Sequence, residues 1–155
     1  MDRADRALLD ALQSDSSRSI GMLADAVALS PSACHRRIKA LEEQGIISGY
    51  GAHVDPRKLG LAAEIFVEIT LNSQSRDAMD GFEQAVCDFP DILECHLMSG
   101  TADYLLRVAA VDLDHYDHIH RDCLSRLPGV SSMRTSFSLR RIKRMSGYPT
   151  TGRTD

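Results

Sequence analysis

The feature that most constrains the fold of this chain is a junction of only two residues, 28–29, between two helical patterns. Apolar residues recur at helical spacing over residues 19–27. The next helix is expected to begin at Ser30, a favourable N-cap, with a proline in the first helical position, and to end at Gly45. Two helices joined by so short a turn must cross at a steep angle, as in a helix-turn-helix. A further helix, expected over residues 5–13, would precede this pair.

The charges of the third helix run against the usual rule. Bases occupy its first half and acids come only at its end, although the helix dipole favours acids at the start. In projection, Cys34, Ile38 and Leu41 share the side expected to face a core, and the bases lie mainly opposite. Helix-turn-helix proteins read base edges with the N-terminal part of this helix, and arginine suits guanine. We therefore predict a surface for double-stranded DNA composed of Ser30, Ser32, His35, Arg36, Arg37 and Lys39, with Arg37 at its edge.

One simpler interpretation and the net charge of the chain limit this prediction. A solvated basic face on a small helical bundle would give the same stripe. The whole chain has a formal net charge of −4, so it is not a basic nucleic-acid coat, and any site for a polyanion must be local. Residues 26–41 contain three cations and no acid, which gives such a local site.

Composition also bears on location. No apolar run is long enough to cross a membrane, and the charged start lacks the apolar segment of a signal peptide. Four scattered cysteines form no C-x-x-C pair, which is typical of free thiols in a reducing compartment. We expect a cytoplasmic protein with no membrane partner and no cofactor.

The second half of the chain has a different pattern. Apolar and polar residues alternate over residues 63–71, which predicts a strand. The elements that follow are a helix over 75–89, strands over 92–98 and 104–110, a helix capped by Asp112 and ended by Gly129, and a long strand within 130–143. This β-α-β-β-α-β order predicts a ferredoxin-like α+β domain. We expect domains at 1–55 and 62–145, a linker at 56–61 that follows a short strand and turn, and a flexible tail at 146–155.

Two other kinds of function have some support in the sequence. His115 and His118, with Asp114, share one helix face at spacings that metal sites use, although no third ligand has a recognisable spacing. A metal-responsive regulator is therefore an alternative, and a solvated polar helix face is the simpler one. Catalysis has less support: each adjacent Cys-His pair points its side chains apart, and there is no Walker loop and no G-x-G-x-x-G. We expect no enzyme.

Three segments in order resemble one family. LSPSACHRRIKALEEQGIISGY resembles the DNA-binding half of the Lrp/AsnC, or feast/famine, transcription regulators. ILECHLMSGTADYLLRV and LPGVSSMRTSFSL resemble their effector domain. The resemblance implies a regulator of amino-acid metabolism that forms dimers and larger assemblies such as octamers. It also implies an amino-acid site between dimers, which maps to Leu97, Ser99, Gly100, Thr101, Ala102, Asp103, Tyr104, Leu113, Ser136, Phe137 and Ser138.

The chemistry of that turn agrees with an amino-acid ligand. A glycine turn can expose backbone N–H groups to a carboxylate, and Asp103 can pair with an ammonium. Leu97 and Leu113 could enclose a side chain, whereas the serines make the pocket more polar than an aliphatic ligand prefers. If Asp103 faces solvent, its replacement should lower the affinity for the ligand and leave the stability of the fold almost unchanged. Ordinary turn chemistry is the alternative for Asp103, and a regulator without an amino-acid ligand is the alternative for the site.

The predicted sheet also implies self-association. Two helices can cover only one face of a four-stranded sheet, so the other face, with Phe66 and Leu105 or Leu106, is expected to meet a second subunit.

Overall fold

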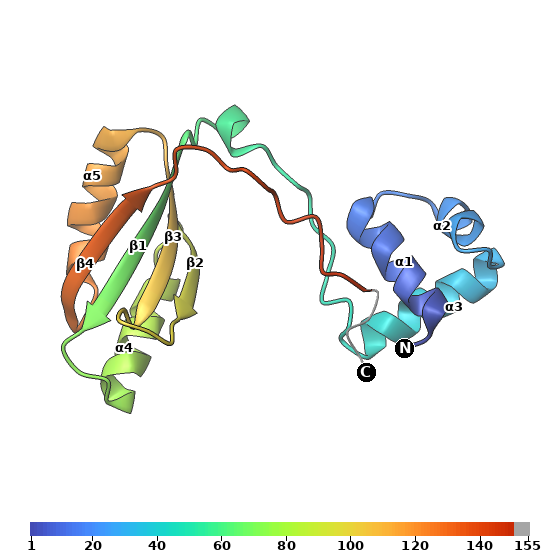
Figure 1. Ribbon diagram of the computed structural model, residues 1–155, viewed down its shortest axis with the longest axis horizontal. Coiled ribbons are helices and arrows are strands. Elements are labelled where there is room, and N and C mark those ends of the chain that lie inside the picture. The colour runs from blue at the N-terminus through green and yellow to red at the C-terminus, as the bar shows by residue number, and fades with distance from the viewer. Residues whose placement is uncertain (151–155) are drawn as a thin grey trace. The chain divides into compact units, whose positions relative to one another are not determined.

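The computed structural model describes residues 1–150 and divides the chain into two compact units. Among the described residues, the helical unit comprises Met1–His53 together with 142–150. The sheet unit comprises Val54–Arg141. Figure 1 shows the elements of both units.

Three helices form the helical unit: α1 (Arg3–Ser14), α2 (Ile20–Ala26) and α3 (Pro31–Glu43). Each begins at a side-chain cap. Asp2 and Asp5 form a capping box on α1, and the hydroxyls of Ser19 and Ser30 accept from backbone N–H groups of α2 and α3. The core between the helices contains Leu8, Leu23, Ala24, Cys34 and Ile38. The expected helix-turn-helix arrangement, with its Ser-Pro start, is confirmed.

The segment after α3 differs from the expectation. Gly45 does end the helix region, with a φ of 69° that glycine adopts without strain. Among the described residues no strand lies between Gly45 and Ala63, and the only regular element there is a short 3-10 helix, η1 (Pro56–Leu59). The segment therefore lacks the strand that was expected, because no neighbouring strand pairs with it.

The sheet unit has the expected ferredoxin-like α+β fold. Its elements are β1 (Ala63–Leu71), α4 (Arg76–Cys87), β2 (Ile92–Leu97), β3 (Tyr104–Ala110), α5 (Leu113–Asp122), η2 (Leu124–Arg126) and β4 (Val130–Phe137). The strand order is β2-β3-β1-β4, and all neighbours are antiparallel. β4 lies within the expected range 130–143, and its pairing with β1 runs as far as Phe137, which is opposite Ile65. The last backbone contact is from Ser138 N–H to the Glu64 carbonyl.

One face of the sheet carries the core. Ile65, Val67 and Ile69 of β1 are fully buried, and Phe82 of α4 and Ile119 of α5 pack into the same cluster. Both helices therefore cover the same face. Side chains at the alternate positions of the strands point to the opposite face, which we call the open face.

Two further expectations concern membrane spans and the C-terminal tail. No helix among residues 1–150 is both long and apolar enough to span a membrane. Of the expected flexible tail, residues 151–155 lie outside the described part of the chain. Tyr148 and Thr150, in contrast, form hydrogen bonds with α1.

Candidate DNA interface and effector cleft

The outer face of α3 presents the side chains that the sequence predicts for DNA. Ser32, His35, Arg36 and Lys39 are exposed, while Cys34, Ile38 and Leu41 on the opposite side are buried. The helix is thus fixed by its apolar side, and its polar side is available to a partner. Ser30 has a structural role, because its hydroxyl accepts from Ala33 N–H and caps the helix.

The Arg37 side chain forms ion pairs within the helical unit. Its Nη1 lies 2.7 Å from a carboxylate oxygen of Asp2 and 2.7 Å from one of Asp5. Both aspartates belong to the capping box of α1, so Arg37 links the start of α1 to the side of α3. The hydrogen bonds to Asp5 and Asp2 raise the pKa of Arg37. Its contacts are those of a residue that holds the helical unit together.

A pocket of about 610 Å³ adjoins the basic face of α3. His35 and Lys39 line it from α3, and Arg18 lines it from the loop between α1 and α2. Tyr50 and Glu42 also line it, and the Tyr50 hydroxyl donates a hydrogen bond of 2.7 Å to Glu42. Burial, with this contact, raises the pKa of Tyr50 to about 12. Arg18, His35 and Lys39 therefore line one pocket beside the exposed face.

The sequence analysis missed Arg18 as a member of this surface. Its position directly before Ser19, the N-cap of α2, could have indicated it, because the first helix of a helix-turn-helix lies across the DNA backbone. Asp15 lies 3.7 Å from its Nε, but both side chains remain substantially exposed.

The predicted effector turn is held by buried contacts. Met98 N–H donates to the Asp103 carbonyl over 2.8 Å, and Asp103 N–H donates to the Ile69 carbonyl over 2.8 Å. Asp103 is only 8% exposed. One oxygen of its carboxylate accepts from Leu71 N–H at 2.7 Å, and the other accepts from the Gln74 amide at 2.6 Å. Asp103 therefore does not face solvent, and we expect its replacement to destabilise the fold.

Tyr104 is also a core residue. It is 1% exposed, its ring lies 4.6 Å from that of Phe82, and its hydroxyl donates to Glu83 at 2.7 Å. Burial and the Glu83 contact raise its pKa well above the ordinary range. Ser99, Gly100 and Thr101, by contrast, are exposed, and they form the accessible part of the turn.

The other group of predicted effector residues, Leu113 and residues 136–138, lies away from this turn. Tyr104 pairs with Ile69, whereas Phe137 pairs with Ile65, four residues along β1. The two groups are therefore separated by about 13 Å along the strand. Leu113 follows the end of β3 near Ala110, on the side of Phe137. A single subunit does not bring all eleven residues into one pocket.

The apolar residues in both groups are exposed. Leu97 is 61% exposed beside the turn, and Leu113 is 67% exposed at the distant end. Phe137 is 44% exposed and contacts Tyr116 of α5 edge to face, with ring centroids 5.3 Å apart. Ser136 and Ser138 flank it on β4 and beyond. Each end of the sheet unit thus offers apolar surface to a further molecule.

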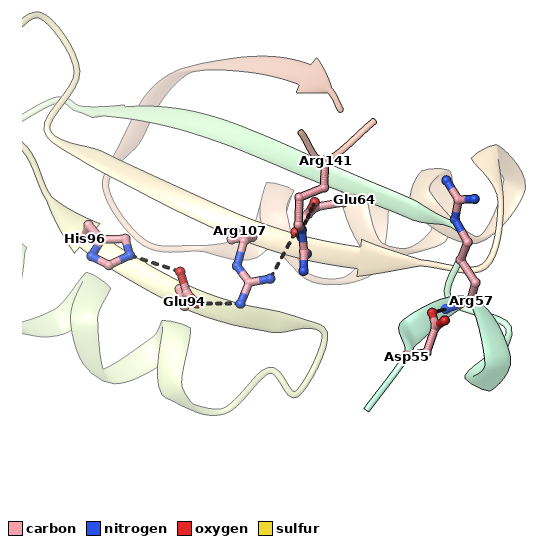
Figure 2. A network of polar contacts seen from close by, with 7 residues as sticks. All are labelled: Asp55, Arg57, Glu64, Glu94, His96, Arg107 and Arg141. Atoms are coloured by element: carbon pink, nitrogen blue, oxygen red, sulfur yellow. Dashed lines mark hydrogen bonds and ion pairs between the residues drawn. The ribbon is translucent and has the colours of Figure 1, made fainter. Parts of the chain in front are cut away.

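The open face of the sheet combines apolar and charged side chains. Phe66 and Leu105 are partly exposed there, whereas Leu106 is fully buried in the core, so Leu105 is the residue that faces outward. Figure 2 shows a chain of ion pairs across the strands of this face. Arg107 contacts Glu64 at 3.1 Å and also contacts Glu94, and Arg141 contacts Glu64.

These ion pairs shift the pKa values of the carboxylates. The hydrogen bond from Arg107 lowers the pKa of Glu94, and His96 lies 3.3 Å from the same carboxylate. Burial alone would raise the pKa of Glu64, but Arg141 and Arg107 together leave it lowered. The carboxylates on this face are thus stabilised in their charged form.

The histidines of α5 have other partners. His115 Nδ1 accepts from Val111 N–H at 3.1 Å, and His118 Nδ1 donates to the Asp114 carbonyl at 2.7 Å. Within residues 1–150, no three His, Cys, Asp or Glu side chains are grouped as metal ligands. The metal-responsive alternative therefore gains no support from the geometry.

Comparisons with known proteins agree with both units. A family model described as winged helix-turn-helix DNA-binding matches residues 1–48, and the Lrp/AsnC ligand binding domain matches residues 64–148. The leucine-responsive regulatory protein of Escherichia coli is 41% identical over 143 residues, which cover 92% of this chain and 87% of that protein.

Two solved structures have the same overall fold. A transcriptional regulator of Neisseria meningitidis in complex with L-Met has a TM-score of 0.93, 32% identity and 97% coverage of both chains. An AsnC family transcriptional regulator from Agrobacterium tumefaciens has a TM-score of 0.91 and 36% identity, with 96% of this chain and 97% of that one covered.

Proposed function

Because the chain belongs to the Lrp/AsnC family of transcription regulators, we propose that it recognises operator DNA through the exposed face of α3. The main observation in support is that this helix has a buried apolar side and an exposed side with Ser32, Arg36 and Lys39. An arginine on this face can donate two hydrogen bonds to guanine in the major groove. His35 and Arg18 would contact the phosphates beside it.

The active form would be a dimer or a larger assembly such as an octamer. Supporting this, the open face of the sheet leaves Phe66 and Leu105 partly exposed between ordered ion pairs. A second sheet packed on this face would bury both. Two recognition helices in one dimer would then read half-sites separated by about 10 base pairs or a multiple of that spacing.

A small amino acid is the proposed effector. In support, the related regulator of Neisseria meningitidis was solved with L-Met. The exposed backbone of Ser99–Thr101 would receive the carboxylate, and Leu97 would contact the side chain. The second group, around Leu113 and residues 136–138, would come from a neighbouring subunit, since the two groups are about 13 Å apart within one chain. Asp103 would hold the turn in position and could still offer a lone pair to the ammonium.

This function places the protein with its DNA in the cytoplasm and requires no catalysis, metal or cofactor. A regulator that responds to no amino acid remains the second candidate, because the exposed turn has polar and apolar features that a protein contact would also use.

The test is a footprint on the DNA upstream of the protein's own gene, with and without each of the twenty amino acids. We expect protection over two half-sites and a change in its extent or concentration dependence with one amino acid. Protection that no amino acid alters would favour the second candidate. Operator recognition would be contradicted if no fragment were protected and if the protein bound every fragment no better than scrambled DNA.

A further inference from the structure

A short basic run follows the last strand of the sheet unit. Residues 140–144 read RRIKR and contain four cations in five positions, in a chain whose net charge is −4. From Cys123 to Thr150 the sequence contains no aspartate or glutamate. This concentration of positive charge lies outside the helix-turn-helix and has no role in the function proposed above.

Most of this run is free to meet a partner. Arg140, Lys143 and Arg144 are exposed and lie in backbone that is neither helix nor strand. Across residues 1–150, Arg141 is the one member of the run with an ion pair, and its partner is Glu64. The other three cations therefore have no intramolecular carboxylate to neutralise them within the described chain.

The residues that follow the run are attached to the helical unit. Tyr148 pairs with the Gln13 side chain through both its backbone groups: its N–H donates to Oε1 at 2.6 Å, and its carbonyl accepts from Nε2 at 3.0 Å. Thr150 is 9% exposed, and its carbonyl accepts from Arg6 at 2.6 Å. Both Gln13 and Arg6 belong to α1.

This attachment limits how far the cations can move from the helical unit. Arg144 is four residues from Tyr148, so at full extension the chain between them spans only about 14 Å. Lys143 and Arg144 are consequently tethered to the unit that carries the recognition helix, and Arg140 lies three residues before Lys143 on the same segment, at the end of the sheet unit. Polyanions that reach α3 would come within range of them.

We infer that Arg140, Lys143 and Arg144 form a second, sequence-independent contact with the DNA backbone. This inference rests on the proposed DNA-binding function and extends it to a site outside the helix-turn-helix. A duplex carries one negative charge per about 1.7 Å of its axis, so three cations in an extended segment can each meet a phosphate within a short stretch. Such contacts raise affinity for every sequence equally and leave base readout to α3.

The experiment measures the salt dependence of binding by the full-length protein. Two duplexes are used: one with the footprinted operator, and one scrambled duplex of equal length and composition. The variant R140Q/K143Q/R144Q is compared with the wild type and with R76Q/R121Q/R126Q, which removes the same charge from exposed positions of α4, α5 and η2. Fluorescence anisotropy is recorded at several salt concentrations, and sedimentation and thermal melting check assembly and folding.

The inference predicts a loss specific to the tail variant. Its plot of log affinity against log salt should become shallower by about 0.9 for each lost phosphate contact, or about 2.7 per chain, on both duplexes. Affinity at low salt should fall at least tenfold, with the operator preference unchanged. The control variant should keep the wild-type slope.

Three results would overturn the inference: an unchanged slope in the tail variant, an equal decrease in both triple variants, or a change in sedimentation that accounts for the loss. The scrambled duplex keeps this test separate from the proposed function. If the wild type shows no operator preference but the tail variant has the shallower slope, operator recognition fails while the basic run still contacts DNA.

Discussion

At the scale of single residues, Arg36 and Arg37 are neighbours with different tasks. Arg36 is exposed on the outer face of α3, whereas Arg37 is paired with Asp2 and Asp5. We predict that Arg37→Ala lowers the melting temperature by several degrees, because it releases two carboxylates at the start of α1. The ratio of affinities for operator and scrambled DNA should stay constant.

Differential scanning fluorimetry and DNA binding check this prediction together. Arg3→Ala, which removes an exposed arginine from the start of α1, is the matched control and should melt like the wild type. If the Arg37→Ala variant kept its melting temperature and lost its operator preference, Arg37 would belong to the base-reading surface.

A second prediction at this scale concerns Asp103. Asp103→Ala leaves Leu71 N–H and the Gln74 amide without their acceptor, so the free energy of unfolding should fall by about 1–3 kcal/mol. Urea denaturation at fixed protein concentration measures the loss. Thr101→Ala, on the exposed part of the same turn, should be nearly neutral. Equal stability of both variants would mean that the buried carboxylate is not structurally required.

At the scale of elements, the ion pairs of the open face should make the sheet unit sensitive to acid. Since the folded-state pKa values of Glu94 and Glu64 are lowered, their contribution is complete above the unfolded value of about 4.5 and is lost as the pH falls through the folded values. Because both side chains are partly exposed, the loss should not exceed about 1 kcal/mol. Unfolding by urea between pH 7 and pH 3 measures it.

Arg107→Met should flatten this pH dependence, since Arg107 contacts both glutamates. Arg134→Gln is the control, because Arg134 lies 3.6 Å from Glu68 and remains largely exposed. An unchanged acid profile in Arg107→Met would show that other carboxylates determine the transition.

Local signals predicted the elements well, and long-range contacts limited the prediction of the site. The Ser30 cap and the alternation over β1 depend on neighbouring residues, and both were found as expected. The partners of Arg37 and Asp103 lie about thirty residues away, so no local pattern distinguished these structural contacts from solvent-facing side chains. The extent of β4 also depended on its pairing with β1.

The effector residues show the same limit at the level of the sheet. Family resemblance selected the turn after β2 and the end of β4, but only the register of both strands with β1 shows that they lie at opposite ends. The sequence could not reveal this separation, because register is a property of paired strands. The separation is the reason why a second subunit enters the proposed cleft.

At the scale of the whole molecule, dimerisation through the open face leads to a further prediction. Phe66→Asp with Leu105→Asp places two charges among Glu64, Glu68 and Glu94, where a second sheet would have to bury them. Sedimentation should show a shift to monomers at micromolar concentration. Val111→Asp, at an apolar residue that is 46% exposed outside the strands, should leave the assembly unchanged. A double variant that stays dimeric would assign the interface to another surface.

The central claim is that α3 reads DNA through its exposed face, and Arg36→Ala tests it most directly. Fluorescence anisotropy is measured for the wild type and the variant on the footprinted operator and on a scrambled duplex at one salt concentration. A base-reading Arg36 predicts a loss of about 1–3 kcal/mol on the operator and a much smaller loss on the scrambled duplex. An equal small loss on both duplexes would make Arg36 a phosphate contact. No loss on either duplex would contradict the assignment of this face to DNA.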